Sequence, residues 1–480
     1  METRTSPDGL VESCVPARLD RLPWTSWHTW VVLALGASWV LDGLEITLAG
    51  ALAAVLTRAD TLALTPAEAG ASASCYLLGA VLGALVFGRA CDRYGRRRLF
   101  FVTVAVYLLA TAASACAWDF ASYALCRALT GAGIGGEYAA INSAIDELVP
   151  ARHRGRVALM VNASYWLGAA LGAGAASALL STSALPADLA WRIAYGVGAL
   201  LGLGVLLLRR HVPESPRWLL THGQAAAAER IVAAAEARAG LGPADGATLP
   251  VTRLRPRGPT PWRTVWQVML VRERRRALLG VVLMAAQAFF YNAIFFTYGL
   301  VLARFYAVPD AAVGHYLLPF AAGNVLGPFV LGKYFDTVGR RPMIALTYAA
   351  SGVLLAVTAA LFQADLLTAT TQTLAWSVVF FFASAAASSA YLTVSEIFPL
   401  ELRAVAIALF FALGTLLGGV AAPALFGWIV GQGAREALTL GYVCAALLMV
   451  GAAWVALRLG VAAEGRGLEE VAPPLSNHPP

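Results

Sequence analysis

Long apolar blocks separated by short polar stretches recur along almost the whole chain. Each block holds roughly 20 residues, which is enough for an α-helix to cross a hydrocarbon core of about 30 Å. Helices are expected because lone strands cannot satisfy their backbone groups in lipid. The pattern predicts spans at 27–51, 70–89, 99–118, 121–146, 156–181 and 191–209, and then at 277–304, 313–332, 343–363, 373–395, 405–430 and 437–458.

One long polar segment, residues 210–276, divides the blocks into two sets of six. Within it, GQAAAAERIVAAAEARAG has the composition of a helix, so we expect a short amphipathic helix followed by a linker rich in Pro and Arg. The pattern therefore predicts an all-α polytopic membrane protein with twelve transmembrane helices. Its parts are an N-terminal tail (1–26), a six-helix bundle (27–209), a central loop (210–276), a second six-helix bundle (277–458) and a C-terminal tail (459–480).

Composition and charge support this class. The chain of 480 residues is 59% hydrophobic and only 13% charged, whereas soluble domains hold about 25% charged residues. The net charge of +7 could suggest nucleic acid, but the arginines crowd alternate loops, as at 96–98 and 274–276. This bias predicts that those loops and both tails are cytoplasmic, in an inner membrane, with no nucleic-acid partner. We expect no removable signal peptide, since residues 1–26 are charged and lack a short apolar core.

Two motifs occur twice. GRACDRYGRRR at 88–98 returns as GKYFDTVGRRP at 332–342, and ELVPARHRG at 147–155 returns as EIFPLELRA at 396–404. Both pairs fall at matching places in their six-span units. Such an internal duplication is typical of transporters whose two bundles move about a site near the membrane midplane.

The same stretches resemble the major facilitator superfamily. Gly88-x-x-x-Asp92-x-x-Gly95-Arg96-Arg97 is similar to its signature loop between spans two and three. The chain also resembles the sugar-porter-like branch of this superfamily, at Glu147-x-x-Pro150-x-x-x-Arg154, PESPR at 213–217, SEIFP at 395–399 and EGRGLEE at 464–470. The resemblance covers the chain end to end and implies a two-bundle fold that works by alternating access.

The repeated motifs also predict a latch on the cytoplasmic side. Arginines can bind carboxylates through two hydrogen bonds, and the resemblance implies that such pairs join the bundles there and break when that side opens. The alternative is that these arginines only fix the topology. The predicted latch residues are Gly88, Asp92, Gly95, Arg96, Arg97, Glu147, Arg154, Glu214, Arg217, Asp336, Arg340, Arg341, Glu396 and Arg403.

Four charged residues fall deep within predicted spans of the first bundle: Asp42, Glu45, Arg127 and Glu137. A charge at the bilayer centre costs about 2.5–3.5 kcal/mol on insertion scales, so such residues usually face a cavity or a partner. Counting about 1.5 Å per residue places Asp42 and Arg127 at similar depths and Glu45 one turn nearer the outer water. We therefore expect Asp42, rather than Glu45, to pair with Arg127.

The resemblance to sugar porters also implies that Asp42 and Arg127 couple proton binding to transport, whereas a static ion pair is the alternative. DGLE at 42–45 resembles the DGxD motif of aromatic-acid:proton symporters, with Glu45 replacing the second Asp. Glu137 follows four glycines, which we expect to serve close helix packing. For Glu137 itself we expect contact with a cationic group, a second proton, or a polar neighbour.

The predicted substrate lining is aromatic and poor in amides. Ala169 and Ala286 stand where sugar porters carry glutamines, although Gln287 and Asn292 match residues of their span seven. This favours a flat or partly apolar solute, since sugars need many hydrogen-bonding partners; core packing is the alternative for each aromatic. The candidates are Arg127, Asn162, Tyr165, Trp166, Gln287, Tyr291, Asn292, Phe295, Tyr298 and Tyr391.

These features predict a proton-coupled symporter for a small organic acid, with an aromatic acid favoured. The alternatives are uptake of a sugar, polyol or organic cation, proton-antiport efflux, and a receptor without transport. No HExxH, GxSxG or GxxxxGK[ST] motif indicates an enzyme or an ATP-driven pump, and no Cys or His spacing indicates a metal. We expect no cofactor besides the coupling proton, partners limited to a small solute and the lipid bilayer, and function as a monomer.

Overall fold

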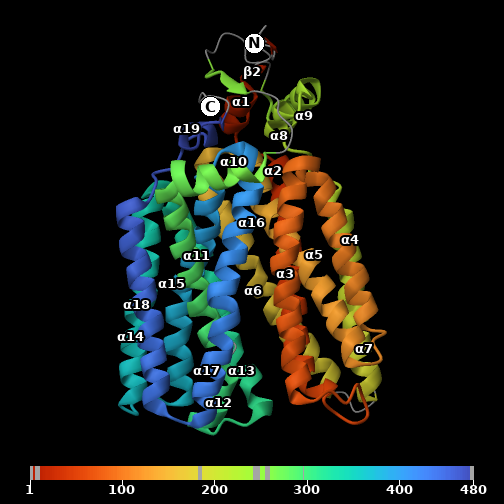
Figure 1. Cartoon of the computed structure of the whole chain (residues 1–480), viewed down its shortest axis with the longest axis vertical. Helices are drawn as coiled ribbons and strands as arrows, with labels where there is room; N and C mark the ends of the chain where they lie inside the picture. The colour runs from red at the N-terminus through yellow and green to blue at the C-terminus, as the bar shows by residue number, and fades with distance from the viewer. Residues whose placement is uncertain are drawn as a thin grey trace.

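The computed structural model describes residues 4–5, 11–181, 186–241, 249–254, 260–295 and 297–475. Its long helices form two bundles that lie side by side (Figure 1). The N-terminal bundle consists of α2 (Ser26–Leu56), α3 (Pro66–Tyr94), α4 (Arg96–Ser114), α5 (Phe120–Leu148), α6 (Arg154–Ser181) and α7 (Ala187–Arg209). The six spans predicted for this half are confirmed, and each helix except α4 is somewhat longer than its apolar block.

The C-terminal bundle has the same number of spans, but two of them are interrupted. The seventh span is divided into α11 (Arg274–Phe295) and α12 (Tyr298–Tyr306), and the eleventh into α16 (Arg403–Gly414), the π-helical turn η4 (Thr415–Val420) and α17 (Ala421–Gln432). Irregular backbone at membrane depth is usually found beside a cavity or inside protein. The remaining spans are α13 (Asp310–Thr337), α14 (Arg340–Gln363), α15 (Ala369–Glu396) and α18 (Arg435–Leu459).

Ten stretches of the described residues are long and apolar enough to cross a membrane. Helices α5 and α13, of 29 and 28 residues, are also long enough to cross a membrane but carry more polar side chains, such as Arg127 in α5 and Asn324 in α13. A twelve-helix arrangement in two halves is confirmed.

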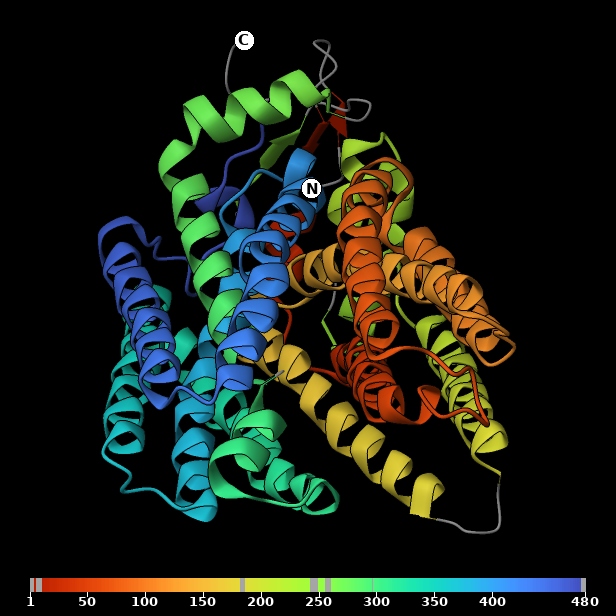
Figure 2. The same cartoon turned by 60° about the horizontal axis from the view of Figure 1, so that its bottom comes forward.

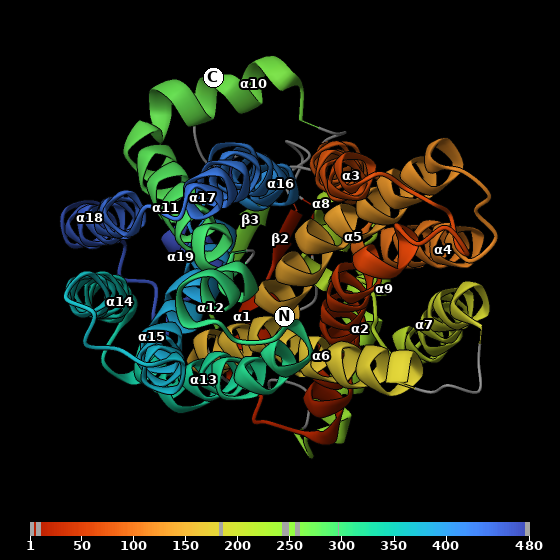
Figure 3. The same cartoon turned by 90° about the horizontal axis from the view of Figure 1, so that it is seen from below.

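Glycines allow the closest helix contacts. A Cβ added at Gly131 or Gly135 of α5 would collide with the backbone of α3, and one at Gly168 of α6 would collide with α2. The predicted packing role of the glycines before Glu137 is therefore confirmed. Between the bundles, α6 lies against α13 and α3 lies against α16. Figure 3 shows these pairs near the middle, with the two halves to either side.

Smaller elements cover one end of the bundles. They include α1 (Val15–Arg21), η1 (Ala151–His153), α8 (Pro216–Thr221), α9 (Ala225–Arg238), α10 (Trp262–Gln267), η2 (Val268–Arg272), η3 (Leu400–Leu402) and α19 (Leu468–Val471). We call this end, where α1 and α19 lie, the latch face, and the opposite end, with the loop 57–65, the far face. Figure 2 turns the far face toward the reader. The amphipathic helix predicted in the central loop is confirmed as α9.

A small antiparallel sheet also lies at the latch face, which the sequence pattern does not predict. Its strands are β1 (Arg4–Thr5), β2 (Val11–Ser13) and β3 (Thr252–Leu254), in the order β1-β2-β3. Glu12 of β2 lies opposite Arg4 of β1 on one side and opposite Arg253 of β3 on the other. The sheet joins the N-terminal segment to the central loop.

Candidate transport site

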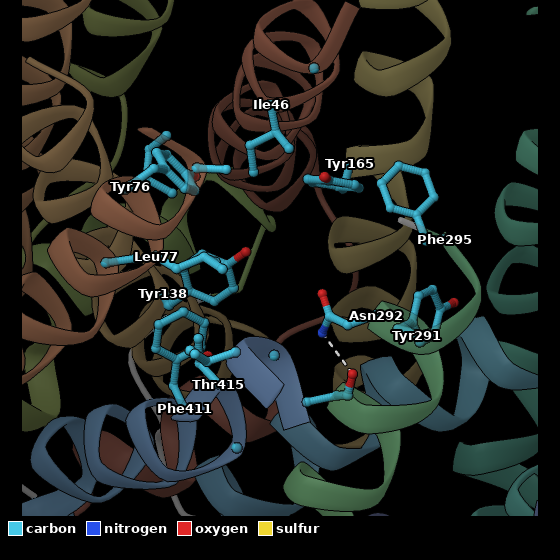
Figure 4. Close-up of a pocket in the computed structure, with 18 of the residues that line it drawn as sticks. Ile46, Tyr76, Leu77, Tyr138, Tyr165, Tyr291, Asn292, Phe295, Phe411 and Thr415 are labelled. Carbon is cyan, nitrogen blue, oxygen red and sulfur yellow. Dashed lines mark hydrogen bonds between the residues drawn. The ribbon is translucent and has the colours of Figure 1, made fainter. Parts of the chain in front are cut away.

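A cavity of about 630 Å³ lies between the two bundles. Its lining reaches Gly50 of α2 and Gly70 of α3, near the far-face ends of those helices, and extends inward to Asn162 and Tyr391. Figure 4 shows the space, with Tyr76, Tyr138 and Phe411 among the side chains that surround it. The volume suits a small organic molecule.

Aromatic rings form much of the wall. Tyr138 of α5 lies against Phe411 of α16, with ring centroids 4.3 Å apart, and Trp166 of α6 lies 5.2 Å from Phe295 of α11. Both contacts join residues of opposite bundles. The amide of Asn292 also faces the cavity, and its Nδ2 donates to the carbonyl of Ala288 at 2.6 Å.

The structure places nearly all predicted lining residues in the cavity wall, as far as its described part shows. These are Arg127, Asn162, Tyr165, Trp166, Gln287, Tyr291, Asn292, Phe295 and Tyr391. The prediction for Tyr298 is wrong. Its ring is 1% exposed and packs against Phe320 and Trp376, while its hydroxyl donates to the carbonyl of Tyr316. The break between α11 and α12 turns this residue away from the cavity.

Several wall residues were not predicted, including Trp39, Tyr76, Tyr138, Ser384, Ser388, Phe411 and Thr415. Two could have been found from helix periodicity. Trp39 lies one turn before Asp42, and Tyr138 lies three turns after Arg127, so each shares a helix face with a predicted residue. The others come from α3, α15, α16 and η4, where the sequence offers small or apolar residues without a buried charge nearby.

Asp42 lies directly behind the cavity wall. Its two carboxylate oxygens accept hydrogen bonds from the hydroxyls of Tyr76 and Tyr138, each at 3.3 Å, and both tyrosine rings line the cavity. The side chain is 6% exposed. Asp42 forms no ion pair in the part of the chain that the structure describes. A carboxylate held only by hydroxyl groups is well placed to exchange a proton with the cavity.

Arg127 pairs with Glu45, so the predicted pairing of Arg127 with Asp42 is wrong in this structure. Arg127 Nη1 lies 2.8 Å from Glu45 Oε1, and the hydroxyl of Thr111 donates to the other carboxylate oxygen at 2.9 Å. The guanidinium also lies over the ring of Tyr76, 5.0 Å from its centroid. The depth count failed because Asp42 and Glu45 are only three residues apart, which is about 4.5 Å along the helix.

Glu137 forms an ion pair with a different arginine, Arg209. Its carboxylate lies 2.7 Å from Arg209 Nη2, at the last residue of α7, and Arg209 also contacts Ser38 of α2. A very small cavity between α2 and α5 is lined by Ser38, Asp42 and Glu137. Of the three alternatives expected for Glu137, the structure shows contact with a cationic group, Arg209, which is the last residue of the predicted span 191–209.

At the latch face, carboxylates from each bundle cap the first turn of a helix in the other. Asp92 of α3 accepts a hydrogen bond from the backbone N–H of Val405 in α16 at 3.1 Å. Asp336 of α13 accepts from the N–H groups of Gly155 and Arg156 in α6 at 2.9 and 2.8 Å. A helix N-terminus attracts negative charge, so both contacts hold the bundles together.

Ion pairs reinforce these caps with the same symmetry. Glu147 pairs with Arg96 at 2.8 Å within its bundle and with Arg403 at 3.6 Å across the interface. In the second half, Glu396 pairs with Arg340 at 3.0 Å and reaches Arg154 of the first half at 3.7 Å. Among the described residues, these contacts close the latch face, while the cavity extends toward the far face.

The tails and the central loop complete the latch. Glu214 accepts from the backbone N–H groups of Arg96 and Arg97 at 2.9 and 3.2 Å. Arg217 pairs with Asp20 of α1 at 2.9 Å and with Glu469 of α19 at 2.8 Å. Burial raises the pKa of the Glu214 carboxyl.

Other predicted latch residues act through their backbone or stay outside it. Gly88 packs on Ala408, and Gly95, with φ of +94°, leaves room for the Glu214 carboxylate. The predicted latch role of the Arg97 and Arg341 side chains is wrong. Both are exposed, and neither forms an ion pair within the described ranges.

The N-terminal segment is fastened to the central loop. Arg18 of α1 pairs with Glu229 at 2.5 Å and with Glu236 at 2.6 Å, both in α9, and Arg21 pairs with Glu236 at 2.7 Å. Burial alone would raise the pKa of the Glu236 carboxyl, but hydrogen bonds from Arg18 and Arg21 hold it below its usual value. Val15 and Leu19 of α1 are almost fully buried.

Comparison with known proteins gives relatives for the whole chain. The niacin transporter NiaP of Acinetobacter baylyi is 27% identical over 458 residues, covering 95% of this chain and 99% of that protein. The probable 4-methylmuconolactone transporter of Cupriavidus pinatubonensis is 27% identical over 399 residues, covering 83% and 81%. The 3-(3-hydroxy-phenyl)propionate transporter of Escherichia coli is 34% identical over 177 residues, covering 37% and 42%.

Solved structures share the fold. The proton:xylose symporter XylE bound to 6-bromo-6-deoxy-D-glucose superposes with a TM-score of 0.75 at 17% identity, over 93% of this chain and 98% of that chain. The family model described as "Sugar (and other) transporter" matches residues 40–474. The predicted superfamily and the absence of an enzymatic role are confirmed. The chain belongs to the sugar (and other) transporter family and is a multi-pass membrane transporter of small molecules.

Proposed function

We propose that the chain is a proton-coupled symporter of a small aromatic carboxylate. The observation that supports this most is the placement of Arg127, the one charged residue among the described residues that line the cavity, in a wall rich in aromatic rings, with Asp42 and Glu45 directly behind that wall. A guanidinium binds a carboxylate through two parallel hydrogen bonds, and flat rings stack on aromatic side chains. Niacin and 3-(3-hydroxyphenyl)propionate, named for two relatives, are compact aromatic acids.

The coupling step follows from competition for Arg127. A substrate carboxylate that binds Arg127 would draw it away from Glu45, the partner it has in this structure. A buried carboxylate that loses its cation costs several kcal/mol unless it takes up a proton. Binding the acid therefore favours binding a proton at Glu45, or at Asp42 next to the same cavity. With both the acid and the proton bound, the N-terminal bundle carries less unpaired charge, and the two bundles can reorient.

The direction of transport rests on which face is cytoplasmic. Arginines are concentrated at the latch face, and the positive-inside bias assigns this face to the cytoplasm of an inner membrane. The cavity would then be loaded from outside in the state shown here. Breaking the latch contacts would open it to the cytoplasm.

Uptake by proteoliposomes tests this proposal. Purified protein should concentrate labelled nicotinate when the outside is acidic, and unlabelled 3-(3-hydroxyphenyl)propionate should compete. Nicotinamide, which keeps the ring but lacks the carboxylate, is the matched control and should compete at least about ten-fold less, because it cannot pair with Arg127. If xylose or a polyol competes better than either acid, the chain is a sugar transporter instead. If none of these solutes is carried, the proposed substrate class is wrong.

A further inference from the structure

Helices α10 and η2 run without a break from Trp262 to Arg272 and lead into α11 after Glu273. In Figure 1 this segment crosses the top of α11 at the latch face, and in Figure 3 it lies at the rim of the bundle. Because α11 crosses the membrane, the segment lies where the bundle meets the membrane surface. Its side chains are therefore in a position to contact lipid.

The segment is apolar on two different sides. Val265, Val268 and Met269 face the protein and are at most 4% exposed. On another side, Trp262, Trp266 and Leu270 follow one another at four-residue intervals and are 38%, 45% and 66% exposed. The two indole rings stack, with centroids 6.3 Å apart. Tryptophan is enriched where proteins meet the headgroup layer, so this stripe fits a membrane surface better than water.

Arginines flank the exposed stripe. Arg263, Arg274 and Arg275 are exposed, and none of them forms an ion pair in the part of the chain that the structure describes. The one acidic residue between 262 and 276 is Glu273, which lies 3.3 Å from Arg276 and 3.9 Å from Arg272. The surface is therefore strongly positive. Each arginine near an anionic membrane surface contributes about 1 kcal/mol of binding.

The segment is held in place at both ends. Arg89 of α3 donates to the carbonyl of Thr260 at 3.1 Å and lies over the ring of Trp262 at 4.9 Å. The hydroxyl of Thr260 donates to the carbonyl of Glu401 in η3 at 2.8 Å. The other end continues toward α11. The surface is thus preformed, and lipid contact does not have to order a flexible loop.

We propose that α10 and η2 form a lipid-binding surface, in which Trp262, Trp266 and Leu270 enter the headgroup layer and Arg263, Arg274 and Arg275 bind anionic phospholipid headgroups. The exposed apolar stripe, the unpaired arginines beside it and the position at the rim carry this inference. It depends on the chain lying in a membrane and is independent of the substrate and coupling proposed above. A second protein covering the same stripe is the competing outcome.

A fluorescent label at the stripe tests the proposal in the full-length protein. Leu270→Cys, in a chain whose six natural cysteines are serine, would carry an environment-sensitive dye and be reconstituted in bilayers containing brominated lipid. Bilayers of phosphatidylcholine alone are compared with about 3:1 phosphatidylcholine and phosphatidylglycerol. We expect quenching in both, and at least about two-fold stronger quenching with phosphatidylglycerol. A label at Leu241→Cys, exposed beyond α9, is the matched control and should not be quenched.

The charge requirement is tested separately. The triple variant Arg263→Gln, Arg274→Gln, Arg275→Gln should lose the added quenching by phosphatidylglycerol and keep that in phosphatidylcholine. If the dye at position 270, with all three arginines present, is quenched equally in the two bilayers, the preference for anionic lipid is overturned. A label at 270 that is shielded from both brominated lipid and aqueous iodide would overturn the proposal, because a protein would then cover the stripe. Neither result depends on which solute is transported.

Discussion

The latch and the cavity wall differ in how evenly the two halves contribute. At the latch, every key contact has a counterpart: Asp92 caps α16 as Asp336 caps α6, and Glu147 reaches Arg403 as Glu396 reaches Arg154. In the cavity region, the buried acids and cations described above all belong to the first half. The contacts that close the latch face are thus shared by both halves, whereas the described acids and arginines beside the cavity come from the first half.

The contrast is sharpest between α5 and α15, which carry Glu147 and Glu396 in their last turns. When residues are counted back from these two glutamates, Arg127 of α5 falls at the same position as Trp376 of α15, and Glu137 falls at the same position as Ala386. Trp376 is fully buried and packs against Tyr298 and Tyr442. The second half thus uses apolar packing where the first half uses charge. Substrate binding and proton coupling should therefore be sensitive to substitutions in the first half, and opening of the latch face to substitutions in either half.

Replacing Arg127 should have the largest effect. Arg127→Ala removes the cation proposed to bind substrate and strands Glu45, a loss of about 3–5 kcal/mol when a buried pair is broken. We expect uptake to fall at least about 100-fold, with Arg127→Lys intermediate because a lysine cannot form the two-pronged contact. Counterflow of labelled substrate in proteoliposomes measures this.

The control for Arg127 is its counterpart in the other half. Trp376→Phe keeps an aromatic ring in the core of the second bundle and should retain uptake within about three-fold. Size-exclusion chromatography of each variant checks that it is folded. Comparable losses in Arg127→Ala and Trp376→Phe would contradict the asymmetry.

The latch substitutions should have intermediate and equal effects. Asp92→Asn and Asp336→Asn each weaken a charge-assisted contact of about 1.5–3 kcal/mol, so each should shift the equilibrium toward latch-face opening by about ten-fold. Alkylation of Ala158→Cys, one turn from Asn162 toward the latch face, reports the opening. Arg97→Gln is the matched control, because that side chain is exposed and outside the latch. A response to Asp92→Asn alone would show that the two halves are not equivalent in gating.

The smallest effect is expected at the N-terminal segment. The lowered pKa of Glu236 means that its contacts with Arg18 and Arg21 stabilise this segment above the usual pKa of a glutamate and are lost as the pH falls through the lowered value. Glu236→Gln should mimic acidic conditions at neutral pH and increase hydrogen exchange in residues 15–21 by about two- to three-fold. Unchanged exchange there, or an equal increase in α14, would exclude a local clamp.

The sequence predicted the twelve spans, the duplicated latch and nine of the residues that line the cavity, because each leaves a local or repeated pattern. It did not predict the partners of the buried charges. Asp42 and Glu45 lie one turn apart on the same helix, and a depth count that treats helices as straight and upright cannot separate them. Arg209 ends the predicted span 191–209, and the apolar pattern does not show that its long side chain reaches back to Glu137 inside the bundle. The strands, of two or three residues, are too short to show a period.

The behaviour of Asp42→Asn tests most directly whether coupling resides in the first half. Asn keeps the shape of Asp but cannot exchange a proton: its Oδ1 can accept from one of the two tyrosine hydroxyls, and its Nδ2 can only donate to the other. Proteoliposomes would be measured first with an imposed pH gradient and then with substrate on both sides. We predict that accumulation on the gradient disappears, while exchange stays within about three-fold, because exchange needs only reorientation of the loaded carrier. If Asp42→Asn still concentrates substrate on a pH gradient, Asp42 is structural and the role assigned to it here is wrong.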